Sequence, residues 1–194
     1  MIKAVIFDFF GVLADHDAMS FRKAYLANDP KKDAEAQRLN DELGRGDLGY
    51  DDFIDGLAKL GGVSREKVLV YTEDYHPNQQ LLGYIRDELK PRYKTGIISN
   101  AGQDWVLKIL GEDNLKLFDN VILSYKVKMI KPDPEIYELS AKNLDLKTEE
   151  CVFIDDILRY CEGAEQVGMN TVWYQDFSGF KSQLEKILAA SSNN

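Results

Sequence analysis

The sequence predicts an α/β protein whose largely parallel sheet carries helices on both faces. Short apolar runs that end in polar residues recur along the chain, and segments with helical periodicity separate them. Apolar runs without alternation are typical of parallel strands that are buried on both sides. Strands that alternate with helices imply right-handed crossovers, so we expect these strands to lie in one Rossmann-like sheet.

The first expected strand is the apolar run AVIF at 4–7, which ends at Asp8. Gly11 breaks the pattern three residues later. Ligands of open α/β sheets bind beyond the carboxyl ends of the strands, and an unpaired buried carboxylate is costly. Asp8 therefore either takes part in chemistry at this edge or simply caps a turn.

The next stretch has helical periodicity and no convincing strand between residues 17 and 75. We expect helices at 17–26, 33–43 and 50–60, and a fourth that begins after Ser64 as its N-cap. The sequence thus predicts an inserted helical cap over residues 15–77. The α/β core would consist of residues 1–14 and 78–194.

From residue 78 onward the α/β alternation resumes. Its apolar runs predict strands, and its amphipathic stretches predict helices, several of which start or stop at Pro or Gly. The expected helices cover 79–89, 102–110, 134–143, 158–167 and 180–190, and the expected strands cover 95–98, 120–123, 151–154 and 171–174.

Length, composition and charge limit the partners and the compartment that we expect for this protein. The chain has 194 residues, enough for one core with a small insertion, and a formal net charge of −9, which argues against nucleic acid or an anionic membrane. No apolar run approaches the roughly 18 residues of a membrane span, and the N-terminus does not resemble a signal peptide. Cys151 and Cys161 have no metal-type spacing and suit a reducing compartment, so we expect a cytoplasmic protein. The oligomeric state stays open.

Three expected strands end in polar groups: Asp8, the pair at 99–100 and the pair at 155–156. If these strands are neighbours in one parallel sheet, the polar groups converge at its carboxyl edge, and Lys131 in a nearby loop could reach them. Converging carboxylates repel one another, and a hard cation such as Mg²⁺ relieves that repulsion while it anchors a phosphate. A carboxylate can also attack a phosphoryl group, with a hydroxyl and an ammonium to neutralise its oxygens.

Four motifs resemble those of the haloacid dehalogenase superfamily, chiefly its phosphatases with a small helical cap. They are FDFFGVL at 7–13, IISN at 97–100, KPDPEIY at 131–137 and FIDD at 153–156. Their order and spacing agree with the family over essentially the whole chain. The helical insertion also falls where the family places its cap, between the first and second motifs.

The resemblance implies a Mg²⁺-dependent phosphatase that forms an aspartyl-phosphate intermediate on a small phosphorylated metabolite. By position, Asp8 would be the nucleophile and a metal ligand. Ser99 would bind the phosphoryl group together with Asn100, and Lys131 would hold that group against the nucleophile.

The same resemblance implies the metal site. Asp156 would be the second carboxylate on Mg²⁺, with Asp155 close by, and the backbone carbonyl of Phe10 would be a further ligand. In the phosphatases, however, an Asp usually stands at the position of Phe10 and exchanges protons with the leaving group and water. Loss of such an acid costs on the order of 10²- to 10⁴-fold in rate.

Phe10 leaves three interpretations open. The protein is a phosphatase whose proton transfer runs through water, a good leaving group or another carboxylate such as Asp15; or it catalyses another reaction of the family; or it binds a ligand or partner with little or no turnover. The family's dehalogenases need no metal and so have no use for an acidic pair. The pair at 155–156 therefore argues against dehalogenation. Phosphonate cleavage would need Lys59 or another cap lysine to enter the site.

Two further positions depart from the family pattern: Lys128 stands where Gly is frequent, and Tyr160 where Asn is common. Purely structural roles are also open at the site. Ser99 could cap the helix expected at 102, Lys131 could be a solvated lysine, and Phe10 could fill the core instead of lining a pocket.

Overall fold

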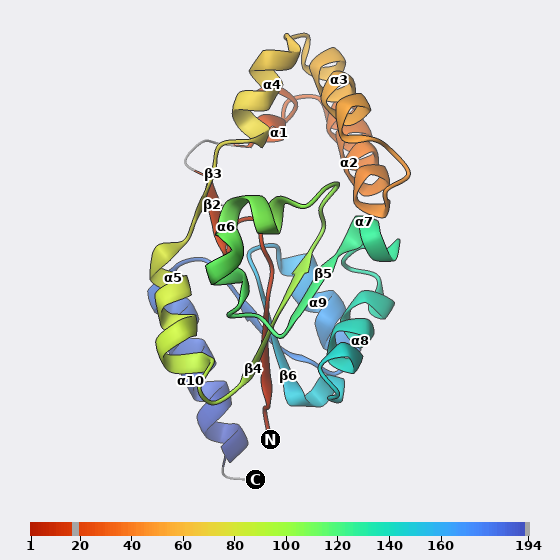
Figure 1. Cartoon of the computed structure of the whole chain (residues 1–194). Coiled ribbons are helices and arrows are strands. Elements are labelled where there is room, and N and C mark those ends of the chain that lie inside the picture. Colours follow the sequence, from red (N-terminus) through yellow and green to blue (C-terminus); the bar gives the residue numbers. More distant parts are fainter. Residues whose placement is uncertain (17–19, 193–194) are drawn as a thin grey trace.

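The computed structural model describes residues 1–16 and 20–192 and contains a five-stranded sheet in the order β5-β4-β1-β6-β7 (Figure 1). All four strand pairings are parallel, which confirms the predicted fold class. The strands are β1 (Ala4–Phe7), β4 (Lys94–Ser99), β5 (Asn120–Leu123), β6 (Cys151–Asp155) and β7 (Asn170–Trp173).

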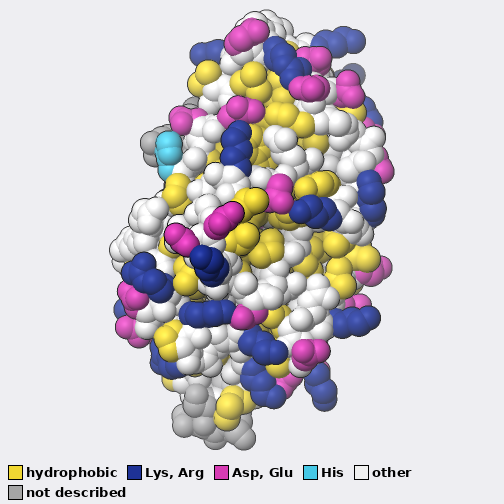
Figure 2. Space-filling model, in the orientation of Figure 1, with side chains coloured by type: hydrophobic (Ala, Val, Ile, Leu, Met, Phe, Trp, Pro, Cys, Tyr) yellow, Lys and Arg dark blue, Asp and Glu magenta, His cyan; other side chains and the backbone are white. Residues whose placement is uncertain are grey.

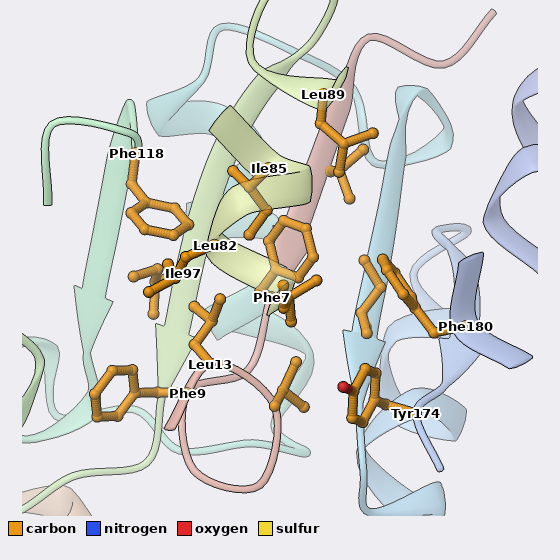
Figure 3. Packing of buried hydrophobic residues seen from close by; sticks show 14 of the residues in the cluster. Phe7, Phe9, Leu13, Leu82, Ile85, Leu89, Ile97, Phe118, Tyr174 and Phe180 are labelled. Atoms are coloured by element: carbon orange, nitrogen blue, oxygen red, sulfur yellow. The ribbon is translucent and has the colours of Figure 1, made fainter. Parts of the chain in front are cut away.

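Helices cover both faces of this sheet. Side chains alternate along the central strand β1, so that Val5 and Phe7 join one hydrophobic cluster while Ala4 and Ile6 join the other. Figure 3 shows the first cluster, in which Phe7 packs among residues of the flanking helices. Its helices are α5 (Gln79–Tyr84), α6 (Trp105–Leu115) and α10 (Phe177–Ser192), and those of the other face are α8 (Pro134–Asn143) and α9 (Leu158–Gln166).

Four helices form a separate group beyond the carboxyl edge of the sheet, at the top of Figure 1: α1 (Phe21–Tyr25), α2 (Pro30–Arg45), α3 (Tyr50–Gly61) and α4 (Arg65–Thr72). This helical group has its own hydrophobic cluster, with Phe21, Leu39 and Ile54 among its members. As predicted, Ser64 caps α4.

The expectation of an entirely helical insertion is wrong at its ends. Strands β2 (Ala14–His16) and β3 (Tyr75–Pro77) pair antiparallel where the chain leaves and re-enters the sheet region. Three residues are too few to establish an alternating pattern in the sequence. The first part of the helix expected at 17–26 lies outside the described residues.

Smaller differences concern helix ends and short elements. The helix expected at 102–110 begins at Trp105, because Asp104 caps it by accepting a hydrogen bond from the Leu107 N–H. The helix expected at 79–89 finishes with a π-helical turn, η1 (Ile85–Leu89). Two short elements were not predicted: α7 (Ser124–Val127) and the 3₁₀ turn η2 (Thr148–Glu150). None of the helices in the described ranges is long and apolar enough to cross a membrane.

Candidate active site

A buried lysine bridges two carboxylates at the carboxyl edge of the sheet. Asp8 follows β1 directly, Asp155 ends the neighbouring strand β6, and Lys131 comes from the loop before α8. The Lys131 Nζ lies 2.5 Å from Asp8 Oδ1 and 2.6 Å from Asp155 Oδ2. The predicted convergence of these groups is confirmed, and the interpretation of Lys131 as a solvated lysine is wrong, since its side chain is 1% exposed.

Asn100 holds the backbone of this lysine. Its Oδ1 accepts a hydrogen bond from the Lys131 N–H at 2.8 Å, and its Nδ2 donates one to the Lys131 carbonyl at 3.0 Å. The Lys131 ammonium also lies 4.9 Å from the centre of the Tyr160 ring and 5.4 Å from that of Phe153. Both polar atoms of the Asn100 amide thus bind the backbone of Lys131 and position it. The ring of Tyr160 lies over the Lys131 ammonium.

Two polar atoms beside this cluster lack partners. Among the described residues, Ser99 Oγ and Asp156 Oδ1 are buried side-chain atoms with no hydrogen bond. Unpartnered buried polar atoms are rare and costly in folded proteins, so they mark positions where a ligand can bind. Ser99 does not cap the following helix, because Asp104 does.

Gly11 allows Asp156 to approach the first motif. A Cβ at position 11 would lie 2.5 Å from Asp156 Oδ2, and the backbone there has a φ of +85°, which favours glycine. The strand-breaking glycine of the sequence therefore has a steric role in the site.

Three carboxylates here suit a divalent cation. Oxygens of Asp8, Asp155 and Asp156 lie within 4.8 Å of one another. Asp155 uses one oxygen on Lys131 and accepts a hydrogen bond from the Ile157 N–H with the other, at 2.8 Å. Asp8 and Asp156 are therefore the carboxylates best able to ligate a hard cation such as Mg²⁺.

The charges of this cluster perturb one another. Burial and the neighbouring Asp155 raise the pKa of Asp156 to about 6, and burial and Asp155 also raise the pKa of Asp8 well above its ordinary range. Burial alone would lower the pKa of Lys131, but Asp155 and Asp8 raise it above its ordinary value, so the ammonium stays charged. One ammonium among three carboxylates leaves a surplus of negative charge that a cation would relieve.

A cavity of about 340 Å³ opens above Asp8 and Lys131, between the sheet edge and the helical group. Phe10 lines it, with its ring 5.0 Å from that of Phe9 and 4.7 Å from that of Tyr75, so Phe10 is a pocket residue and not plain core. The other residues that line the cavity are Ser20, Arg22, Asn40, Leu43, Tyr50, Phe53, Thr72, Tyr75, Asn100, Ala101, Gly102, Trp105, Ile157 and Tyr160. On the face seen in Figure 2, acidic and basic side chains are interspersed.

Two residues considered from sequence lie elsewhere. Asp15 is exposed in β2, opposite His76, and Lys59 is exposed in α3; neither lines the cavity. Sequence reasoning missed Tyr75, which lines the cavity from β3 and whose pKa rises to about 12 through burial and the charges of Asp156 and Asp8. No motif marks it, because only the pairing of β2 with β3 brings it to Phe10.

The model of the haloacid dehalogenase-like hydrolases matches residues 2–168. The chain belongs to this family. It is 27% identical to the D-ribitol-5-phosphate phosphatase of Bacteroides thetaiotaomicron, over 97% of this chain and 99% of that protein. It is also 27% identical to the phosphorylated carbohydrates phosphatase of Thermotoga maritima, over 89% of this chain and 84% of that protein.

Solved structures of the haloacid dehalogenase family share the fold. A family enzyme from Bacteroides thetaiotaomicron, solved as a complex with magnesium and inorganic phosphate, superposes with a TM-score of 0.68 at 25% identity, over 92% of this chain and 98% of that one. A predicted family hydrolase from Porphyromonas gingivalis gives a TM-score of 0.72 at 23% identity, over 97% and 98%.

Proposed function

We propose that this haloacid dehalogenase-family hydrolase is a Mg²⁺-dependent phosphatase that acts on a small phosphorylated metabolite. One observation carries the proposal: a buried carboxylate, Asp8, lines a cavity together with a fixed ammonium, Lys131. At the ends of the two neighbouring strands, Ser99 Oγ and Asp156 Oδ1 are buried polar atoms without partners. These are the groups that phosphoryl transfer to a carboxylate requires. The relatives named as phosphatases of phosphorylated sugars and polyols support the same reaction.

Mg²⁺ would be held by Asp8 and Asp156, with the backbone carbonyl of Phe10 as a further ligand. When bound, the metal would neutralise oxygens of the phosphoryl group. Asp155 keeps its position next to Lys131 and orients the ammonium.

The side chains of the site would carry out the two steps of the reaction. The Asp8 carboxylate forms a bond to phosphorus as the bond from phosphorus to the leaving oxygen breaks. The leaving oxygen departs with the electron pair and takes its proton from water, because Phe10 cannot supply one. Lys131 and Ser99 contact the phosphoryl oxygens and stabilise their charge. Water then hydrolyses the aspartyl-phosphate and regenerates Asp8.

The helical group, with its connecting segments at 15–77, would be the cap on a core of residues 1–14 and 78–194. It would exclude water and select the leaving group, because Arg22, Asn40 and Tyr50 of this group line the cavity above Asp8. We also propose a reducing compartment such as the cytoplasm, since both cysteines are buried and free.

A second candidate is a weak or inactive relative that binds a phosphorylated ligand or a protein. The side chain of Phe10, which cannot donate a proton, favours it. The other reactions of the family have less support. The acidic cluster argues against metal-free dehalogenation. Phosphonate cleavage would need a cap lysine, and among the described residues no lysine of the helical group, Lys59 included, lines the cavity.

The test is Mg²⁺-dependent hydrolysis of p-nitrophenyl phosphate, whose leaving group needs little protonation. We expect wild type to turn over and Asp8→Asn to lose at least about 10³-fold, as is typical for a removed nucleophile. Asp15→Asn, an exposed aspartate outside the cavity, is the matched control and should retain activity.

Phe10→Asp separates the two candidates. If wild type is inactive and Phe10→Asp gains activity, the chain is a binding protein on a phosphatase scaffold. Inactivity of both proteins would count against the phosphatase proposal itself.

A further inference from the structure

The cavity above Asp8 has an aromatic wall. Six aromatic side chains line it: Phe10, Tyr50, Phe53, Tyr75, Trp105 and Tyr160. Tyr50 is the first residue of α3 and Trp105 the first of α6, so the wall is built from both the helical group and the sheet region. Their ring centres lie 5.6 Å apart at an interplanar angle of 69°, an edge-to-face contact that joins the two parts of the wall.

Several polar side chains that line the cavity already have partners within the protein. Arg22 donates to both carboxylate oxygens of Asp33 at 2.8 Å, and the Thr72 hydroxyl lies 3.2 Å from that of Tyr50. Asn100 binds the backbone of Lys131 through both of its polar atoms. A leaving group with several hydroxyls would therefore leave many of them without partners, whereas a flat apolar one matches the wall.

Among the described residues, the cavity also lacks a second carboxyl group that could protonate a departing alcohol. Of the described residues that line it, Asp8 alone carries a carboxyl group, and Asp8 is the nucleophile of the proposed function. An alkoxide leaves slowly without a proton, whereas the anion of an acidic hydroxyl such as a phenol leaves without one.

We propose that the preferred substrates are aryl phosphates, in which the phosphate is esterified to the hydroxyl of a flat aromatic ring. The inference rests on the proposed function and names its substrate class. An Asp8 oxygen forms a bond to phosphorus as the bond from phosphorus to the aryl oxygen breaks, and the phenolate departs with the electron pair. Water then attacks the phosphorus, releases inorganic phosphate, restores the carboxylate and gives its remaining proton to solvent.

The test compares kcat/KM for four compounds: phenyl phosphate, hexafluoroisopropyl phosphate, ribitol 5-phosphate and acetyl phosphate. The second has an acidic but non-planar leaving group, so it separates acidity from shape. We expect phenyl phosphate to exceed ribitol 5-phosphate by at least about 10²-fold. It should exceed hexafluoroisopropyl phosphate about 3- to 10-fold, as an aromatic contact predicts.

Acetyl phosphate, which needs neither an acid nor an aromatic wall, reports phosphatase activity on its own. Turnover of acetyl phosphate with ribitol 5-phosphate as good as phenyl phosphate would overturn the aryl inference and leave the proposed function standing. No turnover of any of the four would overturn both.

Variants test whether the aromatic wall causes the preference for aryl phosphates. Trp105→Leu should lower the ratio of phenyl phosphate to acetyl phosphate turnover about 3- to 10-fold, mainly through KM. Phe118→Leu, an equally buried aromatic of the same hydrophobic cluster that does not line the cavity, should leave that ratio unchanged. An equal loss in both variants would contradict the inference. So would a Tyr75→Phe variant that loses activity on ribitol 5-phosphate alone, since Tyr75 would then supply the proton.

Discussion

The ammonium of Lys131 is what permits two carboxylates to lie buried at the base of the cavity. A buried charge that loses its partner costs about 3–5 kcal/mol, more than the pair itself contributes. Without the ammonium, Asp8 and Asp155 would face each other uncompensated.

We therefore expect Lys131→Met to lower the free energy of unfolding by about 3–5 kcal/mol in metal-free protein, as well as to abolish phosphatase activity. Urea denaturation with chelator measures it. Lys126→Met, which removes a largely exposed ion pair with Asp104, is the control and should cost at most about 1 kcal/mol. Equal losses in the two variants would refute the assignment of Lys131 as the essential counter-charge.

Gly11 offers a second test at the scale of one residue. Gly11→Ala places a methyl group against the Asp156 carboxylate and strains a backbone with positive φ. We expect about a 10- to 100-fold loss of Mg²⁺ affinity, as is typical when a ligand's surroundings are disturbed. Gly62→Ala also has positive φ but meets no atom within 4 Å, so it should affect stability alone. Unchanged Mg²⁺ affinity in Gly11→Ala would contradict the role of Asp156.

The sequence was most informative where a polar residue ends a buried strand. Asp8 and Ser99 could be placed at one edge because parallel strands share their direction, whatever their order. The roles of Tyr160 and Asn100 could not be predicted, because they depend on how the loop of Lys131 folds back over the sheet edge.

Elements were predictable in proportion to their length and regularity. The strand at 120–123 and the helix at 134–143 have the predicted bounds, since each is bordered by a clear change of pattern. β2 and β3 were missed because a two-stranded ribbon of three residues a strand is defined by pairing, not by local sequence. The strand order could likewise not be predicted from the sequence, since it depends on tertiary contacts.

Lys128, at the end of α7, explains one departure from the family pattern. Its φ is +60°, a left-handed conformation that costs a residue with a side chain about 1–2 kcal/mol and that glycine adopts freely. Its ammonium donates to the Gly46 carbonyl at 2.8 Å and so connects the helical group to the sheet region. The strain is thus accompanied by a contact that glycine could not make.

Replacing Lys128 by Gly or by Ala removes the ammonium in both cases, so the difference in stability between the two variants measures the backbone strain. We expect Lys128→Gly to be about 1 kcal/mol more stable than Lys128→Ala in thermal or urea unfolding. Asp145, also at positive φ, gives a parallel pair of variants that should show the same order. Alanine as stable as glycine at both positions would contradict this account.

At the scale of the whole molecule, the protein carries a net charge of −9 but must hold an anionic phosphate. The overall field repels such a ligand, so in the proposed function its binding would depend on Lys131 and a bound cation. The helical group contributes little positive charge of its own to the cavity, because Arg22 is paired with Asp33. In the proposed function, the sheet edge would therefore select the phosphate, and the wall above it would select the leaving group.

Burial of Asp156 beside Asp155 makes the stability of the metal-free protein depend on pH. The pKa of Asp156 rises from 3.8 to about 6 on folding, so between these values the folded protein binds a proton that the unfolded chain has released. Stability from this group is fully present below pH 3.8 and falls as the pH rises to about 6. We expect Asp156→Asn to remove this contribution, so that the stability of the variant relative to wild type increases from pH 4 to pH 7 in the presence of chelator.

Mg²⁺ competes with the proton on Asp156. It should therefore stabilise wild type more at pH 7 than at pH 5, with no such difference in the variant. Thermal unfolding at both pH values with and without Mg²⁺ measures this, and a variant that follows the wild-type profile would show that Asp156 is not the group involved.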